Sequence, residues 1–494
     1  MLARQGALIE RLTSDSRRAA PGAAFFAWPG AAADGRRYIA QAIERGCAAV
    51  LWESAGFAWD GRWKTPNAGV KDLKAQAGFL AHDFYGRPSA SMWVCGVTGT
   101  NGKTSCANWL AHLFALKDIK TGVIGTLGCG FPGSLAENPN TTPDALELHR
   151  LLADFKTAGA HAVAMEVSSH GLDQGRVNGV AFDCALFTNL THDHLDYHGT
   201  LSAYAEAKAR LFETPGLAAA VLNLDDPFGA LLAKRLAARG MRTIGYGVSS
   251  SGKVSGNPAE FICAFEPDAG SLRINSSWGE ARVRFAQLGR FNVANALGVL
   301  GCLAAKGIAF DEGVRLLEAL PQVAGRMQRI GDRPLVVVDY AHTPDALDKV
   351  LSALKPVAQA RGGRLVAVFG AGGGRDKAKR PVMGSVAAAR ADRIVLTSDN
   401  PRGEDPRAIV EAIRDGVSGE CAVELDREAA IFSAIAAAAA ADVVLIAGKG
   451  HEEYQETAGK RLPFSDAKVA AAALGRRAGG TGEAVSLPRS EDGR

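Results

Sequence analysis

Residues 99–104, Gly-Thr-Asn-Gly-Lys-Thr, have types and spacing suited to holding phosphate groups. The segment follows the apolar run Trp93–Val97 and precedes a predicted helix. Backbone N–H groups at such a turn can bind phosphate oxygens, and the helix N-terminus adds positive potential. Lys103 would reach the outer phosphates of a nucleotide, and the Thr104 hydroxyl would bind Mg²⁺. The strict pattern has glycine where this chain has Val97, so a glycine-rich turn without a ligand is the alternative. The surrounding strand and helix favour the nucleotide.

Two side chains at the ends of other predicted strands could complete a magnesium site. Glu166 follows the run Ala162–Met165, and His194 comes soon after the run Ala185–Phe187. The carboxyl ends of parallel strands meet at one edge of a sheet, where ligands bind. Mg²⁺ prefers oxygen ligands. The alternative for His194 is a surface or helix-capping histidine, because residues 191–194, Thr-His-Asp-His, also suit a turn.

The order of the predicted elements places these residues in an α/β protein. Short apolar runs alternate with helical segments from Met92 onward, and the alternation restarts after residues 325–327. This pattern is typical of parallel sheets. Because polar clusters follow the runs in both halves, we predict two α/β domains with facing sites behind a smaller N-terminal domain. The predicted boundaries lie near residues 88 and 322.

Composition argues against several other classes of protein. The 494 residues are 47% hydrophobic and 22% charged, with a net charge of +4 and both signs interspersed, unlike a nucleic-acid-binding protein with a basic stripe. The eight cysteines form no Cys-x-x-Cys pair, so we expect reduced, mostly buried thiols and a cytoplasmic protein. The N-terminus has no apolar signal core. The apolar stretch 429–447 is interrupted by Asp442 and is predicted to be a helix and a strand, not a membrane span. The polar tail, 476–494, is predicted to be disordered.

Five motifs in a fixed order resemble those of the Mur ligases, and the likeness extends from about Asp15 to Asp466. The motifs are the phosphate loop and the segments Asn189–Gly199, Gly289–Ala296, Asp339–Asp345 and Gly448–Glu452. The resemblance implies three α/β domains: a smaller N-terminal domain (1–88) for the UDP part of an acceptor, a central P-loop-type parallel-sheet ATPase domain (89–322), and a C-terminal Rossmann-like domain (323–475) for the incoming amino acid. It also implies a monomeric enzyme that uses ATP and Mg²⁺.

Within the family, the chain most resembles members that add meso-diaminopimelate to UDP-N-acetylmuramoyl-L-alanyl-D-glutamate in peptidoglycan precursor synthesis. The implied reaction has two stages. ATP phosphorylates the free carboxylate of the D-glutamate, and the amine then attacks the acyl phosphate. A carboxylate becomes a good electrophile only when its oxygen can leave, so the protein mainly positions reactants and neutralises negative charge.

The resemblance assigns ATP contacts to the phosphate loop and to later motifs: Gly99, Thr100, Asn101, Gly102, Lys103, Thr104, Ser105, Asn292, Asn295, Arg326, Asp339 and His342. It assigns metal binding to Thr104, Glu166, His194 and Lys208, and catalytic roles to Lys103, Lys208 and His194. Lys208 would react with CO₂ to form a carbamate, N6-carboxylysine, that binds metal. Composition alone would make Lys208 a solvated lysine on a helix.

The resemblance also assigns the two other substrates. The acceptor positions are Ser16, Thr141, Thr142, Ser168, Gln174 and Arg176. The diaminopimelate positions are Arg375, Asp399, Asn400, Pro401, Arg402, Gly448 and Glu452. The alternative for the Thr141-Thr142 pair is a helix N-cap before Pro143-Asp144. The alternative for Arg402 is a solvated turn arginine.

Three other functions stay open at this stage. A ligase that adds L-lysine, or another Mur or folylpolyglutamate-type ligase, would share the ATP motifs. A phosphoryl-transfer enzyme outside the family would use the same loop. A non-catalytic binding homologue is disfavoured because Lys103, Thr104, Glu166, His194 and Lys208 are all present.

Overall fold

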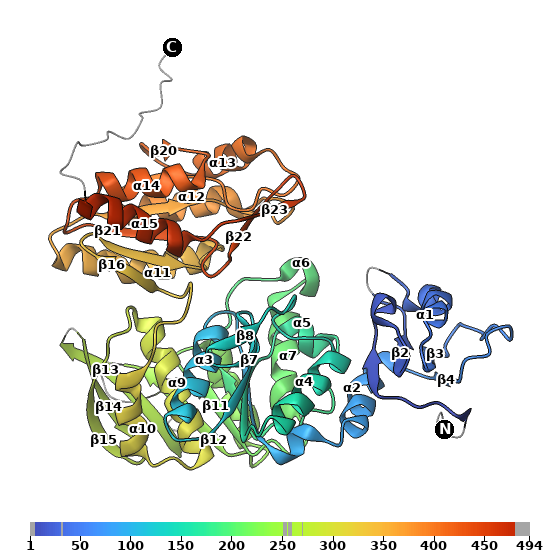
Figure 1. Ribbon diagram of the computed structural model, residues 1–494. Coiled ribbons are helices and arrows are strands. Elements are labelled where there is room, and N and C mark those ends of the chain that lie inside the picture. Colours follow the sequence, from blue (N-terminus) through green and yellow to red (C-terminus); the bar gives the residue numbers. More distant parts are fainter. Residues whose placement is uncertain (1–4, 31–32, 250–253, 255–258, 269, 480–494) are drawn as a thin grey trace.

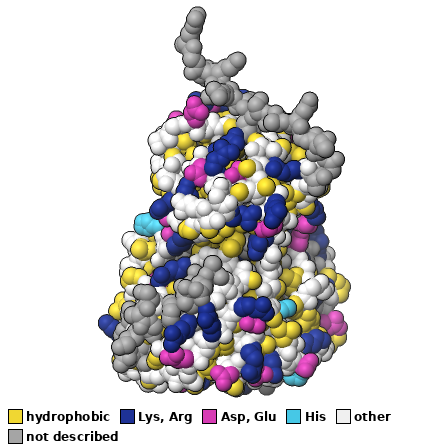
Figure 2. All heavy atoms as spheres, turned by 90° about the vertical axis from the view of Figure 1, so that its left-hand side faces the viewer, with side chains coloured by type: hydrophobic (Ala, Val, Ile, Leu, Met, Phe, Trp, Pro, Cys, Tyr) yellow, Lys and Arg dark blue, Asp and Glu magenta, His cyan; other side chains and the backbone are white. Residues whose placement is uncertain are grey.

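The computed structural model describes residues 5–30, 33–249, 254, 259–268 and 270–479. Three sheets with their helices follow one another along the chain, coloured blue, cyan to yellow, and orange to red in Figure 1. The predicted α/β class is confirmed. Figure 2 shows basic and acidic side chains interspersed on one face of the molecule.

The N-terminal sheet has four parallel strands in the order β1-β2-β3-β4. The strands are Arg11–Thr13, Ala23–Ala27, Ala49–Glu53 and Asn67–Val70. Helices α1 (Ile39–Glu44) and α2 (Leu73–Phe84) pack on opposite faces of it.

The central sheet has eleven strands, and its middle is parallel. The order is β15-β14-β13-β12-β11-β10-β5-β9-β6-β7-β8. The parallel strands are β5 (Trp93–Thr98), β6 (Thr121–Gly125), β9 (Ala162–Glu166), β10 (Cys184–Phe187), β11 (Ala219–Asn223), β12 (Thr243–Val248) and β13 (Glu260–Asp268). Antiparallel edges are β7 (Gly128–Phe131), β8 (Ser134–Ala136), β14 (Ser271–Ser276) and β15 (Gly279–Arg284).

Helices cover both faces of this sheet, which explains why its central parallel strands, such as β5, β9 and β10, are apolar along their length. On one face lie α3 (Lys103–Ala115), α9 (Arg290–Lys306) and α10 (Phe310–Leu316). On the other lie α4 (Ala145–Thr157) and α8 (Pro227–Ala237). The short helices α5 (Ser169–Asp173), α6 (Leu195–His198) and α7 (Leu201–Ala209) follow β9 and β10.

The C-terminal sheet has six strands in the order β16-β17-β21-β18-β19-β20. They are Gln328–Asp332, Leu335–Asp339, Val443–Ala447, Leu365–Phe369, Arg393–Leu396 and Ala422–Val423. Helices α11 (Pro344–Ala360), α12 (Lys379–Arg390) and α13 (Pro406–Arg414) pack on one face, and α14 (Arg427–Ala437) and α15 (Asp466–Gly479) on the other. A separate hairpin joins β22 (Tyr454–Thr457) to β23 (Lys460–Pro463).

Local structure agrees with most of the predictions made for the C-terminal segments and the cysteines. The stretch 429–447 forms most of α14 and then β21, as predicted. The tail prediction was wrong for residues 476–479, which continue α15, and residues 480–494 lie outside the described part. All eight cysteines are free thiols, and seven of them are buried, as expected. Among the residues that the structure describes, no helix combines the length and apolar composition needed to cross a bilayer.

Candidate active site

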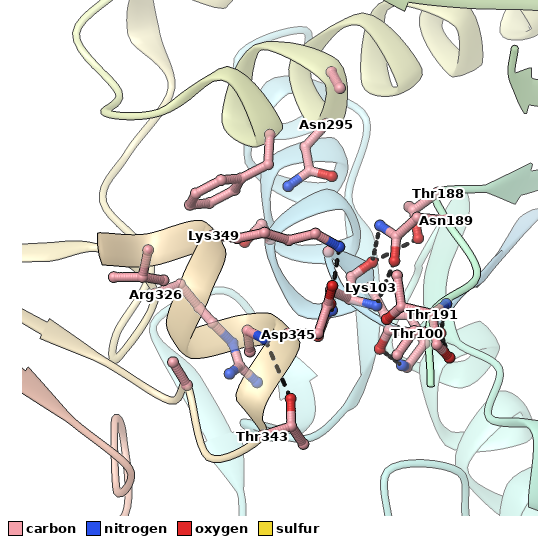
Figure 3. Close-up of a pocket in the computed structure, with 18 of the residues that line it drawn as sticks. Thr100, Lys103, Thr188, Asn189, Thr191, Asn295, Arg326, Thr343, Asp345 and Lys349 are labelled. Carbon is pink, nitrogen blue, oxygen red and sulfur yellow. Dashed lines mark hydrogen bonds and ion pairs between the residues drawn. The ribbon is translucent and has the colours of Figure 1, made fainter. Parts of the chain in front are cut away.

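A cavity of about 880 Å³ lies between the central and C-terminal sheets. The phosphate loop and α9 contribute one wall, and residues from Arg326 to α11 contribute the other (Figure 3). Most of the predicted ATP and metal residues line it: Thr100, Asn101, Gly102, Lys103, Thr104, Ser105, Glu166, His194, Asn292, Asn295, Arg326, Asp339 and His342. The two sheet edges predicted to face each other therefore do so.

The phosphate loop connects β5 directly to α3. Val97, the departure from the strict pattern, lies inside β5 and pairs with Glu166 of β9. Gly102 has a φ of +89°, and a Cβ there would lie 2.4 Å from Oδ1 of Asn295, so the tight approach of α9 requires glycine. Lys103 Nζ donates hydrogen bonds of 2.9 Å to the carbonyls of Gly99 and Thr100. Burial lowers the pKa of Lys103.

Side chains from the loop that follows β10 hold the phosphate loop in place (Figure 3). Thr188 Oγ1 donates to the carbonyl of Asn101 at 2.6 Å, and the backbone N–H of Asn101 donates to Oδ1 of Asn189 at 3.0 Å. These bonds fix the loop before any ligand arrives.

Thr104 and Glu166 bring two oxygen ligands together beside the loop. Thr104 Oγ1 donates to Oε2 of Glu166 at 3.0 Å, and the Glu166 carboxylate also accepts from the N–H of Thr126 at 2.7 Å. Both side chains are buried, and both line the cavity. Their oxygens are the donor type that Mg²⁺ prefers, so these residues fit the metal.

Lys208 lies on α7 behind the loop and is 1% exposed. Its Nζ donates to the carbonyl of Gly99 at 2.8 Å and lies 4.2 Å from the centre of the Tyr204 ring. Burial, and then the nearby charge of Lys103, lowers the pKa of Lys208 well below its ordinary value. The alternative of a solvated lysine was wrong, because α7 turns this side chain toward the loop.

His194 borders the cavity at the start of α6, with a left-handed φ of +53°. It occupies the N-cap position, yet its side chain makes no capping hydrogen bond. Its ring lies 4.8 Å from that of His170 and 6.1 Å from that of Tyr204. The side chain is 47% exposed, so the alternative of a surface histidine describes its position at the edge of the cavity. Partial desolvation lowers the pKa of His194, which favours the neutral imidazole that binds metals.

The C-terminal sheet contributes cationic and polar groups to the cavity. Arg326 Nη2 donates to Thr104 Oγ1 at 3.1 Å, and its guanidinium lies 4.6 Å from the Tyr340 ring. Asp339 accepts from the N–H groups of Met327 and Ala341 at 2.7 and 2.8 Å. The Asp339 carboxylate therefore fixes the backbone beside Arg326. His342 Nδ1 lies 2.8 Å from the carbonyl oxygen of Tyr340.

Two of the predicted ATP contacts, Asn292 and Asn295, lie on α9. Asn292 and Asn295 are both buried and lie 3.4 Å apart, from Nδ2 of Asn295 to Oδ1 of Asn292. Asn292 Nδ2 also donates to the carbonyl of Leu288 at 2.8 Å.

Four of the predicted acceptor residues lie together next to Glu166. Thr142 Oγ1 donates to the Glu166 carbonyl and accepts from the N–H of Ser168, both at 3.0 Å. Arg176 donates to the carbonyl of Thr142 at 2.8 Å and to Oε1 of Gln174 at 2.7 Å.

The two remaining acceptor positions, Thr141 and Ser16, lie in different parts of the molecule. Thr141 borders the cavity, whereas Ser16 lies apart, in a short 3-10 helix (Ser16–Arg18) after β1, where its hydroxyl donates to Oε1 of Gln41 at 2.7 Å. The helix-cap alternative for the threonine pair was wrong, because Asp144 caps α4.

The predicted diaminopimelate residues form a second cluster, after β19 and β21. Asn400 Nδ2 donates to Oε2 of Glu452 at 2.7 Å. Gly448 has a φ of +118°, and a Cβ there would lie 2.4 Å from Oδ2 of Asp399. That oxygen is buried and has no hydrogen-bond partner among the described residues. Pro401 is buried between Asn400 and Arg402.

Hydrogen bonds from the β22–β23 hairpin hold the backbone of Arg402 in a left-handed conformation. Its φ is +53°, its N–H donates to the carbonyl of Glu456 at 2.9 Å, and its carbonyl accepts from Ala458 at 2.6 Å. The guanidinium donates to the carbonyl of Gly373 at 2.6 Å. The alternative of a solvated turn arginine was wrong, because the side chain is only 30% exposed. Exposed Arg375 lies nearby, since a Cβ on Gly372 would lie 3.0 Å from Nη1 of Arg402 and 3.9 Å from Cγ of Arg375.

Lys449 was missed by the sequence analysis, although it lies inside a quoted motif. It is 0% exposed, and its Nζ donates to Oδ1 of Asn400 at 2.8 Å and to Oε2 of Glu452 at 3.2 Å. A lysine between two glycines gives no sequence signal for burial. Only the fold shows that it connects two predicted site residues.

Comparisons with known proteins cover almost the whole chain. Residues 8–85 match the description "Mur ligase family, catalytic domain", residues 97–303 "Mur ligase middle domain", and residues 325–450 "Mur ligase, glutamate ligase domain". A protein of Chromobacterium violaceum named UDP-N-acetylmuramoyl-L-alanyl-D-glutamate–2,6-diaminopimelate ligase is 49% identical over 96% of each chain. One of the same name from Pseudomonas aeruginosa is 48% identical over 94% of this chain and 95% of its own.

Solved structures agree. A ligase structure of that name is 36% identical, with a TM-score of 0.68 over 95% of each chain. A MurF ligase from Thermotoga maritima, in complex with ADP, shares the fold at 19% identity and a TM-score of 0.64, over 95% of this chain and 98% of its own. Matches this long, on a chain whose phosphate loop faces a second α/β sheet, confirm the predicted relationship: the chain belongs to the Mur ligase family.

Proposed function

We propose that this chain is an ATP-dependent ligase that adds meso-diaminopimelate to UDP-N-acetylmuramoyl-L-alanyl-D-glutamate. The observation that carries the proposal is 49% identity, over 96% of each chain, to a protein named for that activity. The cavity between the two sheets and the Asn400–Glu452 cluster are consistent with a nucleotide and an amino acid bound at separate places. The products would be the amide, ADP and phosphate.

The terminal phosphoryl group of ATP would pass to the D-glutamate carboxylate, and the amine would then displace phosphate. Lys103 would stabilise the transferring group from its place on the loop, where its Nζ now bonds two loop carbonyls. The other nucleotide contacts would come from Gly99, Thr100, Asn101, Gly102, Thr104, Ser105, Asn292, Asn295, Arg326, Asp339 and His342. Stabilisation of developing charge by such preorganised groups is a large part of catalysis in closed sites.

Thr104 and Glu166 would hold Mg²⁺, and His194 and carbamylated Lys208 would hold a second ion. A bound Mg²⁺ would neutralise negative charge on the phosphates. The support is the 3.0 Å contact between two buried oxygens of Thr104 and Glu166. For Lys208 the support is its lowered pKa, since the neutral amine is the form that adds CO₂, releasing a proton and leaving an anionic carbamate.

The acceptor would lie along Thr141, Thr142, Ser168, Gln174 and Arg176, with its uridine near Ser16. The three sheets support domains over 1–88, 89–322 and 323–475, one for each substrate. For the amine, Arg402 and Arg375 would bind the carboxylate that distinguishes diaminopimelate from lysine, because a planar guanidinium pairs with a carboxylate through two parallel bonds. Asp399, Asn400, Pro401, Gly448 and Glu452 would surround its distal amine and carboxylate.

The test is phosphate release by purified enzyme with acceptor, ATP and one amino acid at a time. We expect release only when all three are present, and with meso-diaminopimelate far above L-lysine. Equal use of L-lysine would mean a different amine for the same ligase. Release without any acceptor would point to a phosphoryl-transfer enzyme, and none under any condition to a binding protein.

A further inference from the structure

Three thiols meet in the core of the central sheet, outside the site described above. The Sγ atom of Cys302 lies 3.8 Å from that of Cys95 and 3.9 Å from that of Cys184, and all three sulfurs lie within 4.8 Å of one another. Each of the three residues is 0% exposed. Among the described residues, no other three His, Cys, Asp or Glu side chains bring ligand atoms so close.

The fold forms this triangle from segments distant in sequence. Cys95 of β5 and Cys184 of β10 are direct partners in parallel pairing. Cys302 comes from α9, which packs closely against the sheet at this point. A Cβ on Gly301 would lie 2.6 Å from Cγ1 of Val221, so the glycine allows this approach. Cys302 then points between the two strands.

The sulfur positions suit one shared ion. Metal–thiolate bonds are about 2.3 Å long, so three sulfurs in one plane around an ion lie about 4.0 Å apart, and those around a pyramidal ion lie closer. The measured distances of 3.8 and 3.9 Å are near the planar value, and the third pair, which lies within 4.8 Å, must shorten as the sulfurs close on a pyramidal ion. Thiolates are soft ligands, so hard ions such as Mg²⁺ are poor candidates.

The apolar surroundings favour an ion whose charge equals that of the three thiolates, so that the bound group is neutral. The neighbours belong to the main hydrophobic core of the sheet, and the charges acting on Cys184 are those of Asp183 and Arg242, which are opposite in sign. A buried net charge is costly without a partner. Three thiolates with Cu⁺ leave two negative charges, and with Zn²⁺ one. A trivalent ion leaves none and needs no fourth ligand.

We propose that Cys95, Cys184 and Cys302 form a binding site for a trivalent, thiol-seeking metalloid, represented by arsenic(III). Arsenous acid and three thiols give one As(S-Cys)₃ group and three molecules of water, so no oxidant and no net charge are involved. The bound ion would connect β5, β10 and α9. Strand β5 leads into the phosphate loop, β10 leads into Thr188 and Asn189, and α9 carries Asn292 and Asn295.

The test uses the full chain, reduced with a phosphine that contains no thiol. The protein is incubated with sodium arsenite, both folded and during refolding from denaturant, because the site is closed to solvent. After gel filtration, arsenic per chain is counted by elemental mass spectrometry. We expect one arsenic atom per folded chain, with three sulfur neighbours and no oxygen in X-ray absorption.

Matched variants decide which thiols bind. We expect no bound arsenic in Cys95→Ala, Cys184→Ala or Cys302→Ala. One of these variants is enough to assign the site, provided that it still shows the thermal unfolding transition of a folded protein. Cys47→Ala and Cys421→Ala, which remove thiols elsewhere, should retain it. The proposal is overturned if folded wild type takes up none by either route, if the triangle variants retain it, or if Zn²⁺ binds these three thiols more tightly than arsenic(III).

Discussion

Arg326 donates a hydrogen bond to Thr104 across the cavity, at 3.1 Å, and so joins the C-terminal sheet to the first turn of α3. A bond to a charged donor contributes about 1.5–3 kcal/mol. The proposed nucleotide would lie against both partners.

Arg326→Ala is therefore expected to lower kcat/KM for ATP by roughly ten- to a hundredfold. The measurement is steady-state phosphate release at varied ATP. Arg329→Ala, three residues away and paired with exposed Asp332, is the matched control and should be near wild type. An unchanged kcat/KM in folded Arg326→Ala would remove this residue from the site.

Lys103→Ala should reduce turnover by on the order of a hundredfold or more, since a group that stabilises the transferring phosphoryl would be lost. The exposed Lys117, just beyond the end of α3, provides the control Lys117→Ala. Phosphate release at saturating substrates measures the effect. Wild-type turnover of a folded Lys103→Ala protein would contradict the assignment.

Lys208→Met should be nearly inactive, because a thioether cannot replace a metal-binding carbamate. Phosphate release at saturating substrates measures this loss.

The buried Lys208 amine also makes the stability of the wild-type protein depend on pH. The pKa of Lys208 is lowered in the folded state, so between that pKa and the ordinary lysine value of about 10.4 the unfolded chain binds more protons. Wild type should gain up to about 1.4 kcal/mol per pH unit relative to Lys208→Met as pH rises through this window.

Urea unfolding of both proteins at several pH values, in CO₂-free buffer, measures that difference. Parallel curves for the two proteins would show that Lys208 is not a buried, neutral amine. Intact mass spectrometry in bicarbonate buffer should separately detect one added carboxyl group on wild type and none on the variant.

Arg402→Ala should lose most activity with meso-diaminopimelate and narrow the preference over L-lysine. L-lysine lacks the second carboxylate, so the partly buried Arg402 guanidinium would keep only its contacts within the protein and gain no bond to the substrate, which is a basis for discrimination. Arg407→Ala, on the exposed face of α13, is the control. Comparing kcat/KM for the two amino acids gives the answer. An unchanged ratio in Arg402→Ala would place the recognition elsewhere.

Lys449→Met tests the buried lysine between Asn400 and Glu452. Its loss leaves both polar groups without their shared donor, so we expect KM for the amino acid to rise while KM for ATP stays near wild type. Lys449→Arg keeps the charge and should restore part of the loss. Equal changes in both KM values would indicate a general loss of structure instead.

The sequence predicted the strands and the sheet edge well, because buried parallel strands are apolar and end in polar clusters. Val97 and Glu166 illustrate this, since both lie where the pattern put them. Burial of single lysines was not predictable. Lys208 and Lys449 lie in segments whose composition matches a solvent-exposed surface, and tertiary packing alone decides their exposure.

The choice between neighbouring cap residues and the contacts between distant segments were equally unpredictable. Asp144, not the threonine pair, caps α4, and both choices satisfy the same local preference. The cysteine triangle joins positions more than 200 residues apart, from Cys95 to Cys302. No spacing rule covers such a distance, and the approach of α9 to the sheet depends on packing along its whole length.

The β22–β23 hairpin offers a way to alter substrate choice without changing any residue proposed to contact the substrate. It forms no part of the six-stranded sheet, and it pairs with the backbone of Arg402 through Glu456 and Ala458. Lengthening its turn at Ala458-Gly459 would change the backbone hydrogen bonds to Arg402, and so the direction in which the Arg402 side chain points. The hairpin is therefore a place where an insertion would act on the substrate site through the backbone alone.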